Sequence, residues 1–145
     1  MRLDRFMAIS TLLLLSACGT LHEAGVYKLY PGPERPDSEL ATLAFGDRVY
    51  AMEVDGLKVS AGDYGEVKLL PGEHRITWGA TFAVSVMVNP AMSDRADSEQ
   101  TVNLVAGKRY TVEADRTTGP GYLMFLWIED AETGEAVAGH KKTKR

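Results

Sequence analysis

Cysteine and histidine are scarce in this sequence. Its 145 residues include one cysteine and three histidines, so a disulfide within the chain is excluded. His22, His74 and His140 lie in none of the spacings from which proteins build metal sites. We therefore expect no metal site, no cofactor, and a fold that is held together by a packed hydrophobic core.

An excess of positive charge is also missing. The chain has 16 Lys+Arg against 20 Asp+Glu, a formal net charge of -4 and a pI near 5.4. A nucleic-acid-binding domain would show a broad basic surface, so we do not expect nucleic acid as a partner. A basic run, 141–145, ends the sequence. It could rest on anionic lipid headgroups, lipopolysaccharide phosphate or peptidoglycan carboxylates, or it could be a solvated tail.

Residue patterns that declare a reaction are absent as well. No Gly-x-Ser-x-Gly elbow occurs. Two carboxylate pairs, Glu53 with Asp55 and Glu129 with Asp130, could serve in acid–base chemistry, but such neighbours are more often solvent-facing charges or turn residues. His74 opens a strand after a turn, where we expect its ring to bond a backbone carbonyl. We expect no catalytic residue and predict that the protein is not an enzyme.

The N-terminus has the charge order of a signal peptide. Arg2 and Arg5 precede an apolar stretch, 6–15. This stretch is about ten residues long, whereas a membrane-spanning helix needs roughly twenty. We therefore expect a segment that is cleaved rather than a permanent anchor.

The sequence Leu-Ser-Ala-Cys follows at once, at 15–18, and contains the single cysteine. It resembles the lipobox of bacterial lipoproteins. The resemblance implies cleavage between Ala17 and Cys18 and a diacylglyceryl group on the Cys18 thiol, which anchors the protein in a membrane. Gly19, where inner-membrane lipoproteins often carry Asp, favours the outer membrane and a periplasm-facing domain in a two-membrane host. The alternative is an ordinary secretory signal that happens to contain a cysteine.

Composition divides the chain further. We predict a signal peptide (1–17), a lipidated tether with one short strand and a Pro-rich loop (18–37), a β-sandwich domain (38–139), and a basic tail (140–145). The short strand, 26–30, is expected to join the sandwich, and the Pro-rich loop is expected to space the domain from the membrane.

Period-two alternation and closely spaced turn residues predict an all-β fold. We expect an antiparallel β-sandwich of about nine or ten short strands without a helical segment. Asp55-Gly56 is typical of a two-residue hairpin turn, and the polar run Ser93–Gln100 reads as a loop. Eleven segments are candidates for these strands: 26–30, 40–45, 49–54, 57–60, 66–70, 73–78, 81–88, 101–105, 108–114, 122–128 and 135–138.

One part of the predicted domain resembles a known module. Val54-Asp55-Gly56, then Tyr64, then the segment 67–77 with Pro71-Gly72 and His74 resemble the core of PEGA-type extracytoplasmic β domains. Such modules are not known as enzymes. The resemblance implies a surface or envelope role rather than chemistry.

Aromatic residues are the remaining candidates for binding. Trp78, Tyr122 and Trp127 could build a stacking platform for a ligand, although alternating strands place such residues in the core first. The segment 122–127 is apolar on both faces, so one face could be an exposed patch or a subunit contact. Asp94, Asp97 and Glu99 could bind calcium, but a solvated loop is the simpler interpretation.

These observations predict a non-enzymatic cell-envelope lipoprotein. Its sandwich would act as a membrane-tethered structural or protein-interaction module that contacts an envelope protein or peptidoglycan. The alternative is a binding module for cell-wall glycan or a small periplasmic ligand. The oligomeric state does not follow from one sequence.

Overall fold

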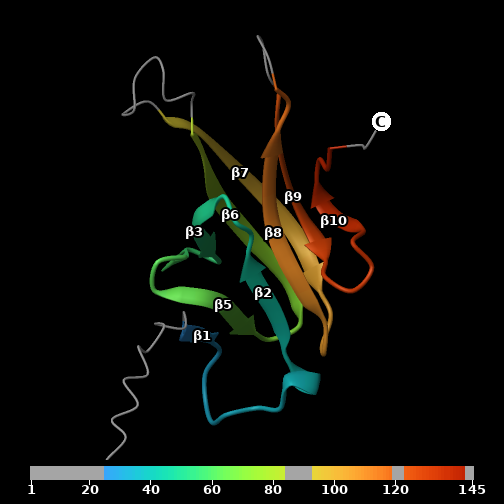
Figure 1. The fold of residues 1–145 in the computed structure, drawn as a ribbon. Helices are drawn as coiled ribbons and strands as arrows, with labels where there is room; N and C mark the ends of the chain where they lie inside the picture. Colours follow the sequence, from blue (N-terminus) through green and yellow to red (C-terminus); the bar gives the residue numbers. More distant parts are fainter. Residues whose placement is uncertain (1–24, 84–92, 119–122, 143–145) are drawn as a thin grey trace, which may run out of the picture.

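A computed structural model describes residues 25–83, 93–118 and 123–142. Within these residues lie ten strands and one short 3-10 helix, so the all-β prediction is confirmed (Figure 1). The predictions for Ala17, Cys18 and Tyr122 lie outside the described residues. The elements are β1 (Gly25–Leu29), η1 (Asp37–Glu39), β2 (Ala41–Phe45), β3 (Val49–Val54), β4 (Leu57–Ser60), β5 (Tyr64–Leu69), β6 (Gly72–Ala83), β7 (Ser93–Leu104), β8 (Arg109–Arg116), β9 (Met124–Asp130) and β10 (Ala136–Gly139).

The strands form two sheets. The six-stranded sheet has the order β1-β5-β2-β8-β9-β10, and the four-stranded sheet has the order β4-β3-β6-β7. Most neighbours are antiparallel, but β1 with β5 and β2 with β8 are parallel, so the prediction of a purely antiparallel sandwich was too simple. β1 and β2 lie on opposite sides of β5 and run in opposite directions, so β1 is parallel to β5 while β2 is antiparallel to it. β2 and β8 are parallel because the chain passes through the other sheet between them.

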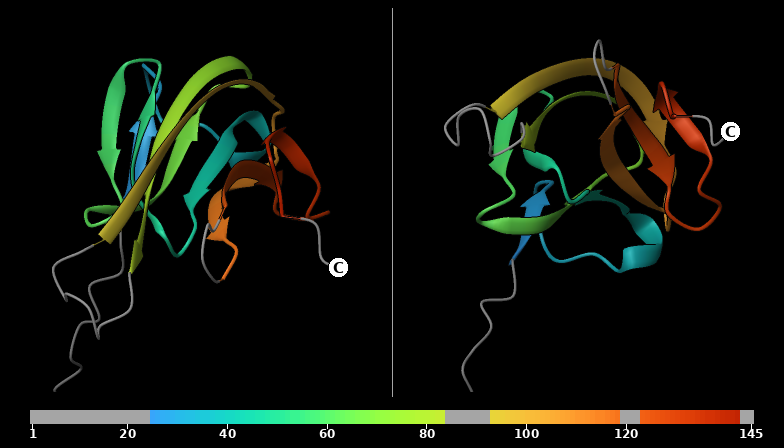
Figure 2. Two further views of the ribbon diagram at one scale, coloured as in Figure 1. Left: turned by 90° about the horizontal axis from the view of Figure 1, so that it is seen from above. Right: turned by 45° about the horizontal axis from the view of Figure 1, so that its top comes forward.

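The core lies between the sheets and follows the period-two pattern. On β8, buried Tyr110, Val112 and Ala114 alternate with residues of the outer face. On β6, Ile76 and Trp78 face the same interior. The views in Figure 2 show β7 curving around the molecule, and β10 packs against it.

The polar segment before residue 101 is a strand, which corrects the prediction of a loop at Ser93–Gln100. β6 and β7 each have 12 residues and pair along their whole length, from Gly72 with Leu104 to Ala83 with Ser93. β7 is an edge strand of its sheet, so its outward residues meet water while its backbone bonds to β6. A strand of this kind needs little hydrophobic sequence.

The Pro-rich segment does not project as a spacer, and that prediction was wrong. It connects β1 to β2, which both pair with β5. Tyr30 is buried, and its hydroxyl accepts a hydrogen bond from the Arg35 N–H. Lys68 of β5 binds the Asp37 carboxylate at 2.6 Å. The strand predicted at 26–30 therefore joins the sandwich as β1, as expected, and the segment that follows it packs against the same sheet.

Candidate functional site

The two tryptophans proposed for ligand binding do not share a surface. Trp78 lies in the core between the sheets and is 1% exposed, but it is also among the residues that line the hollow described below, so its contact with a ligand stays a prediction. Its indole nitrogen is buried and has no hydrogen-bond partner within the described residues. Trp127 lies on the outer face of the six-stranded sheet, because its neighbour Ile128 faces the core.

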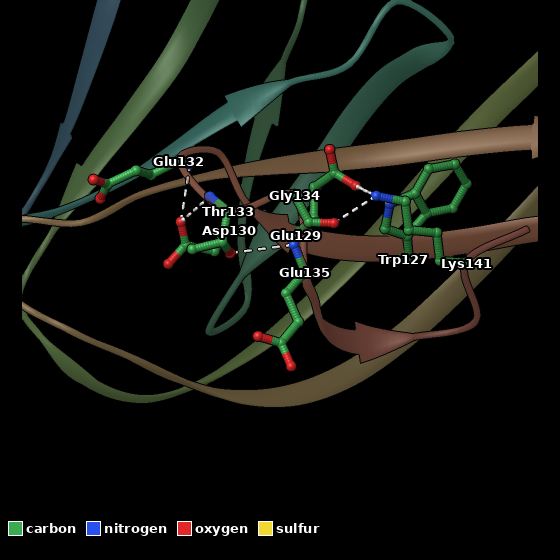
Figure 3. Close-up of polar contacts among 8 residues, drawn as sticks. All are labelled: Trp127, Glu129, Asp130, Glu132, Thr133, Gly134, Glu135 and Lys141. Carbon is green, nitrogen blue, oxygen red and sulfur yellow. Dashed lines mark hydrogen bonds and ion pairs between the residues drawn. The ribbon is translucent and has the colours of Figure 1, made fainter. Parts of the chain in front are cut away.

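Trp127 is covered by the C-terminal segment of the chain (Figure 3). Its Nε1–H donates to Glu129 Oε2 at 2.7 Å, and the Lys141 ammonium donates to the same oxygen at 2.5 Å. Lys141 also donates to the Gly134 carbonyl and lies 6.0 Å from the centroid of the Trp127 ring. Burial raises the pKa of Glu129, but the hydrogen bonds from Lys141 and Trp127 outweigh it and lower that pKa below its ordinary value. With these neighbours around it, the Trp127 side chain is 8% exposed.

The segment 140–142 is bound to the sheet rather than solvated. The His140 N–H donates to the Leu126 carbonyl at 2.9 Å. The Lys142 ammonium donates to the Arg116 carbonyl at 3.1 Å and lies 3.4 Å from the Asp115 carboxylate. The interpretation of residues 140–145 as a tail therefore fails for its first three positions, and residues 143–145 lie outside the described part.

Asp130 organises the turn between β9 and β10 (Figure 3). Its Oδ1 accepts hydrogen bonds from the N–H groups of Glu132 and Thr133. Its Oδ2 accepts a hydrogen bond from the Lys108 ammonium at 2.5 Å. The Lys108 hydrogen bond and then the two backbone hydrogen bonds lower the pKa of Asp130. Because Glu129 and Asp130 alternate along the strand and point to opposite faces, they do not form an acid–base pair.

Asp55 and His74 bind each other. Asp55 Oδ2 lies 2.6 Å from His74 Nδ1, and Asp55 Oδ1 accepts the Arg75 N–H at 2.9 Å. His74 Nε2 lies 2.8 Å from the Leu70 carbonyl oxygen, so the expected bond to a backbone carbonyl is confirmed. A ring that is protonated on both nitrogens donates to both acceptors. Both oxygens of the Asp55 carboxylate are thus engaged in structural hydrogen bonds. Asp55 is therefore not available as an acid–base partner for Glu53.

A hollow opens on the outer face of the four-stranded sheet, above Gly79. Its volume is about 270 Å³. The register places Gly79 between Ala51 of β3 and Asp97 of β7. A Cβ on Gly79 would lie 2.5 Å from the Tyr50 hydroxyl oxygen and 2.7 Å from Asp97 Oδ1. These two polar atoms therefore converge over a residue that has no side chain.

A bulge in β3 aims Tyr50 at this hollow. The pairing of β3 with β6 shifts between Val49 and Ala51, so Tyr50 is the extra residue. Its side chain is an exposed aromatic group at 41%. Tyr50 also lines a second hollow, of about 410 Å³. The residues that line this second hollow include Asp47, Arg48 and Thr81.

Two carboxylates border the first hollow. Besides Tyr50, Gly79 and Asp97, its lining consists of Ala51, Met52, Glu53, Lys58, Thr77 and Trp78. Among the described residues, no hydrogen bond or ion pair engages the carboxylate of Glu53 or of Asp97. Thr77 Oγ1 donates to Glu99 at 3.2 Å. The hollow thus offers an aromatic wall, two hydrogen-bond-accepting carboxylates and a donating ammonium group.

Sequence reasoning did not find this hollow. Tyr50 gave no signal in the sequence. Glu53 was considered only as half of a carboxylate pair with Asp55, and Asp97 only as a possible calcium ligand in a predicted loop. The one local signal is Gly79, because glycine within a strand often marks a close approach by a ligand or another chain.

Comparison of the chain with known protein families, with curated proteins and with solved structures finds no match. Within the described residues, no group of three or more His, Cys, Asp or Glu side chains could hold a metal ion. The same part of the chain contains no helix that is long and apolar enough to cross a membrane.

Proposed function

We propose that this protein is a non-enzymatic, lipid-anchored component of the bacterial cell envelope, whose β-sandwich acts as an interaction module. The lipobox-like sequence at 15–18 supports an anchor on Cys18, with cleavage after Ala17. Gly19 supports an outer-membrane location with the domain in the periplasm. An envelope protein or peptidoglycan is the partner that fits this location.

The position of β1 carries the proposal. Gly25 follows Cys18 by seven positions and already pairs with β5. Seven residues span at most about 25 Å when fully extended, so a lipid on Cys18 would hold the sandwich close to the membrane surface. β1 is an edge strand, and β10 forms the opposite edge of the same sheet. The anchor and the segment 140–142 would therefore lie at different edges.

Metabolic labelling with an alkyne fatty acid tests the anchor. We expect the full-length protein to incorporate label and to sediment with membranes, and Cys18→Ala to lose both properties. Ser16→Ala is the matched control, because it changes a lipobox neighbour and keeps the thiol. Label that persists in Cys18→Ala would contradict the proposal.

In-cell crosslinking of a tagged protein tests the interaction. We expect an envelope protein or peptidoglycan fragments to be recovered, and recovery to depend on Cys18. Equal recovery with Cys18→Ala would show that the anchor is not required for contact.

A second candidate function is binding of cell-wall glycan or of a small periplasmic ligand. It is favoured by the hollow beside Gly79, whose lining includes the exposed Tyr50 and the carboxylates of Glu53 and Asp97.

A further inference from the structure

Gly79 has no conformational reason to be glycine. It lies within β6, and its backbone is not in the left-handed region. Glycine weakens a strand, because it gains no packing and loses more backbone entropy than other residues. What Gly79 provides is room for the Tyr50 hydroxyl and the Asp97 carboxylate, which lie so close to its backbone that any Cβ would collide with them.

We propose that the hollow bordered by Tyr50 and Asp97 is a saccharide-binding subsite, which deepens the second candidate function and rests on it. A sugar ring has an apolar C–H face and several hydroxyl groups. The exposed ring of Tyr50 can pack against the C–H face. The carboxylates of Asp97 and Glu53 can accept hydrogen bonds from the sugar hydroxyl groups, and the Lys58 ammonium can donate to ring or hydroxyl oxygens.

Other ligand classes fit this site less well. A divalent cation would need more oxygen or nitrogen ligands than the two carboxylates, and the described residues hold no cluster of three. An anion would meet Asp97 and Glu53 with only Lys58 in favour. An apolar ligand would leave both carboxylates desolvated without partners. A neutral, hydroxyl-rich ligand satisfies all of these groups together.

The second hollow extends the site. Tyr50 lines both hollows, so the two are neighbours. Asp47, Arg48 and Thr81 supply polar groups in the second hollow. A glycan of several units could place one sugar in each hollow. We therefore assign an oligosaccharide rather than a single sugar as the ligand.

The test is a titration of the full-length protein in detergent with chitotetraose and with cellotetraose, followed by calorimetry. We expect saturable binding of at least one of them. Asp97→Asn should raise the Kd about tenfold or more, because a hydrogen bond to a charged acceptor is lost. Glu99→Gln is the matched control, since Glu99 lies on the same face of β7, two positions away, outside the hollow. We expect its Kd to stay within about twofold.

Gly79→Ala should displace Tyr50 and Asp97 from their positions and abolish binding, and Tyr50→Ala should weaken it. Thermal melting reports whether each variant folds, and Asp97→Asn decides the outcome if Gly79→Ala does not. Absence of saturable binding to both oligosaccharides, or equal Kd values for Asp97→Asn and Glu99→Gln, would overturn the proposal. Neither result depends on Cys18, so failure here would leave the anchor proposal standing.

Discussion

Asp55, in the turn between β3 and β4, binds His74 of β6, with 2.6 Å between Asp55 Oδ2 and His74 Nδ1. Asp55 has a φ of 51°, and Gly56 follows with 87°, which is the backbone of a two-residue hairpin turn. His74 in turn binds the carbonyl of Leu70, next to the turn that opens β6. The β3–β4 turn and the β5–β6 turn are thereby joined through two side chains.

Asp55→Asn should remove this connection while keeping the turn, because asparagine also tolerates a positive φ. Burial raises the pKa of Asp55, but the hydrogen bonds from His74 and the Arg75 N–H outweigh it and lower that pKa below 3.8. We expect the variant to lose about 1 kcal/mol or less of unfolding free energy near pH 6, because the half-exposed carboxylate is screened by solvent.

The pH dependence separates charge from shape in this variant. A carboxylate whose folded pKa is lowered stabilises above its ordinary pKa of 3.8, and this stability is lost as the pH falls through the folded pKa. Urea unfolding between about pH 2.5 and about pH 5.5 should therefore show the wild type converging on Asp55→Asn at low pH. A constant difference across this range would argue that the charge of Asp55 contributes nothing.

Two glycines of the β9–β10 region should respond very differently to alanine. Gly134 and Gly139 both have positive φ, 69° and 76°. A Cβ on Gly134 would meet nothing nearer than 3.9 Å, whereas a Cβ on Gly139 would lie 2.3 Å from the Leu126 carbonyl oxygen. We expect Gly134→Ala to cost about 1 kcal/mol from backbone strain alone, and Gly139→Ala to cost about 2 kcal/mol more.

Chemical denaturation of the two variants measures both costs. Gly134→Ala is the control for the shared backbone conformation. Equal losses would mean that β10 moves away from β9 without penalty, and that the close approach of Gly139 does not hold the segment 140–142 in place.

The ionised side chain of Glu113 is destabilised by its surroundings in the folded protein. Burial first, and then the nearby charges of Glu129 and Asp47, raise its pKa above 4.5. Such a group stabilises the fold below its unfolded pKa, and this contribution is lost as the pH rises through the folded pKa. Glu113→Gln should therefore raise the melting temperature at pH 7, and the gain should vanish below pH 4.5.

Glu73→Gln, at an exposed position of β6, is the control for removing one negative charge from an acidic protein. If both variants gain equally at pH 7, net charge rather than the surroundings of Glu113 explains the effect.

Local sequence signals predicted much of the fold. Asp55-Gly56 carries its own turn geometry, and the alternation on β8 separates inner from outer residues without help from other strands. The part of β7 before residue 101 was missed because its polar residues carry no hydrophobic pattern, and its pairing is supplied by β6. Alternation placed Trp78 on one face with Ile76, but alternation does not show which face meets the other sheet.

The candidate site depends on relationships that lie far apart in the chain. Asp97 reaches Gly79 through the register of a long hairpin, and Tyr50 reaches it through a bulge on another strand. No local pattern encodes a bulge of this kind. The same is true of Lys141, which reaches Glu129 only because β10 folds back along β9.

The cover over Trp127 yields a last prediction. Lys141→Gln removes the ammonium that binds Glu129 and faces the indole ring. We expect the pKa of Glu129 to rise toward or above its ordinary 4.5, because burial then acts with less opposition. NMR titration of the glutamate side chains measures this shift. Lys142→Gln is the matched control, since its partners are Asp115 and the Arg116 carbonyl, and it should leave Glu129 unchanged.

The same variants report on the ring itself. In a Trp78→Phe background, fluorescence arises from Trp127 alone, since the chain has 2 Trp. Loss of the Lys141 bridge should make this fluorescence easier to quench with acrylamide, whereas Lys142→Gln should have little effect. Unchanged quenching in Lys141→Gln would mean that strand packing covers the indole without the lysine. In that case the segment 140–142 would bind the sheet without shielding Trp127, and detaching the segment would not make the indole ring more accessible to a partner.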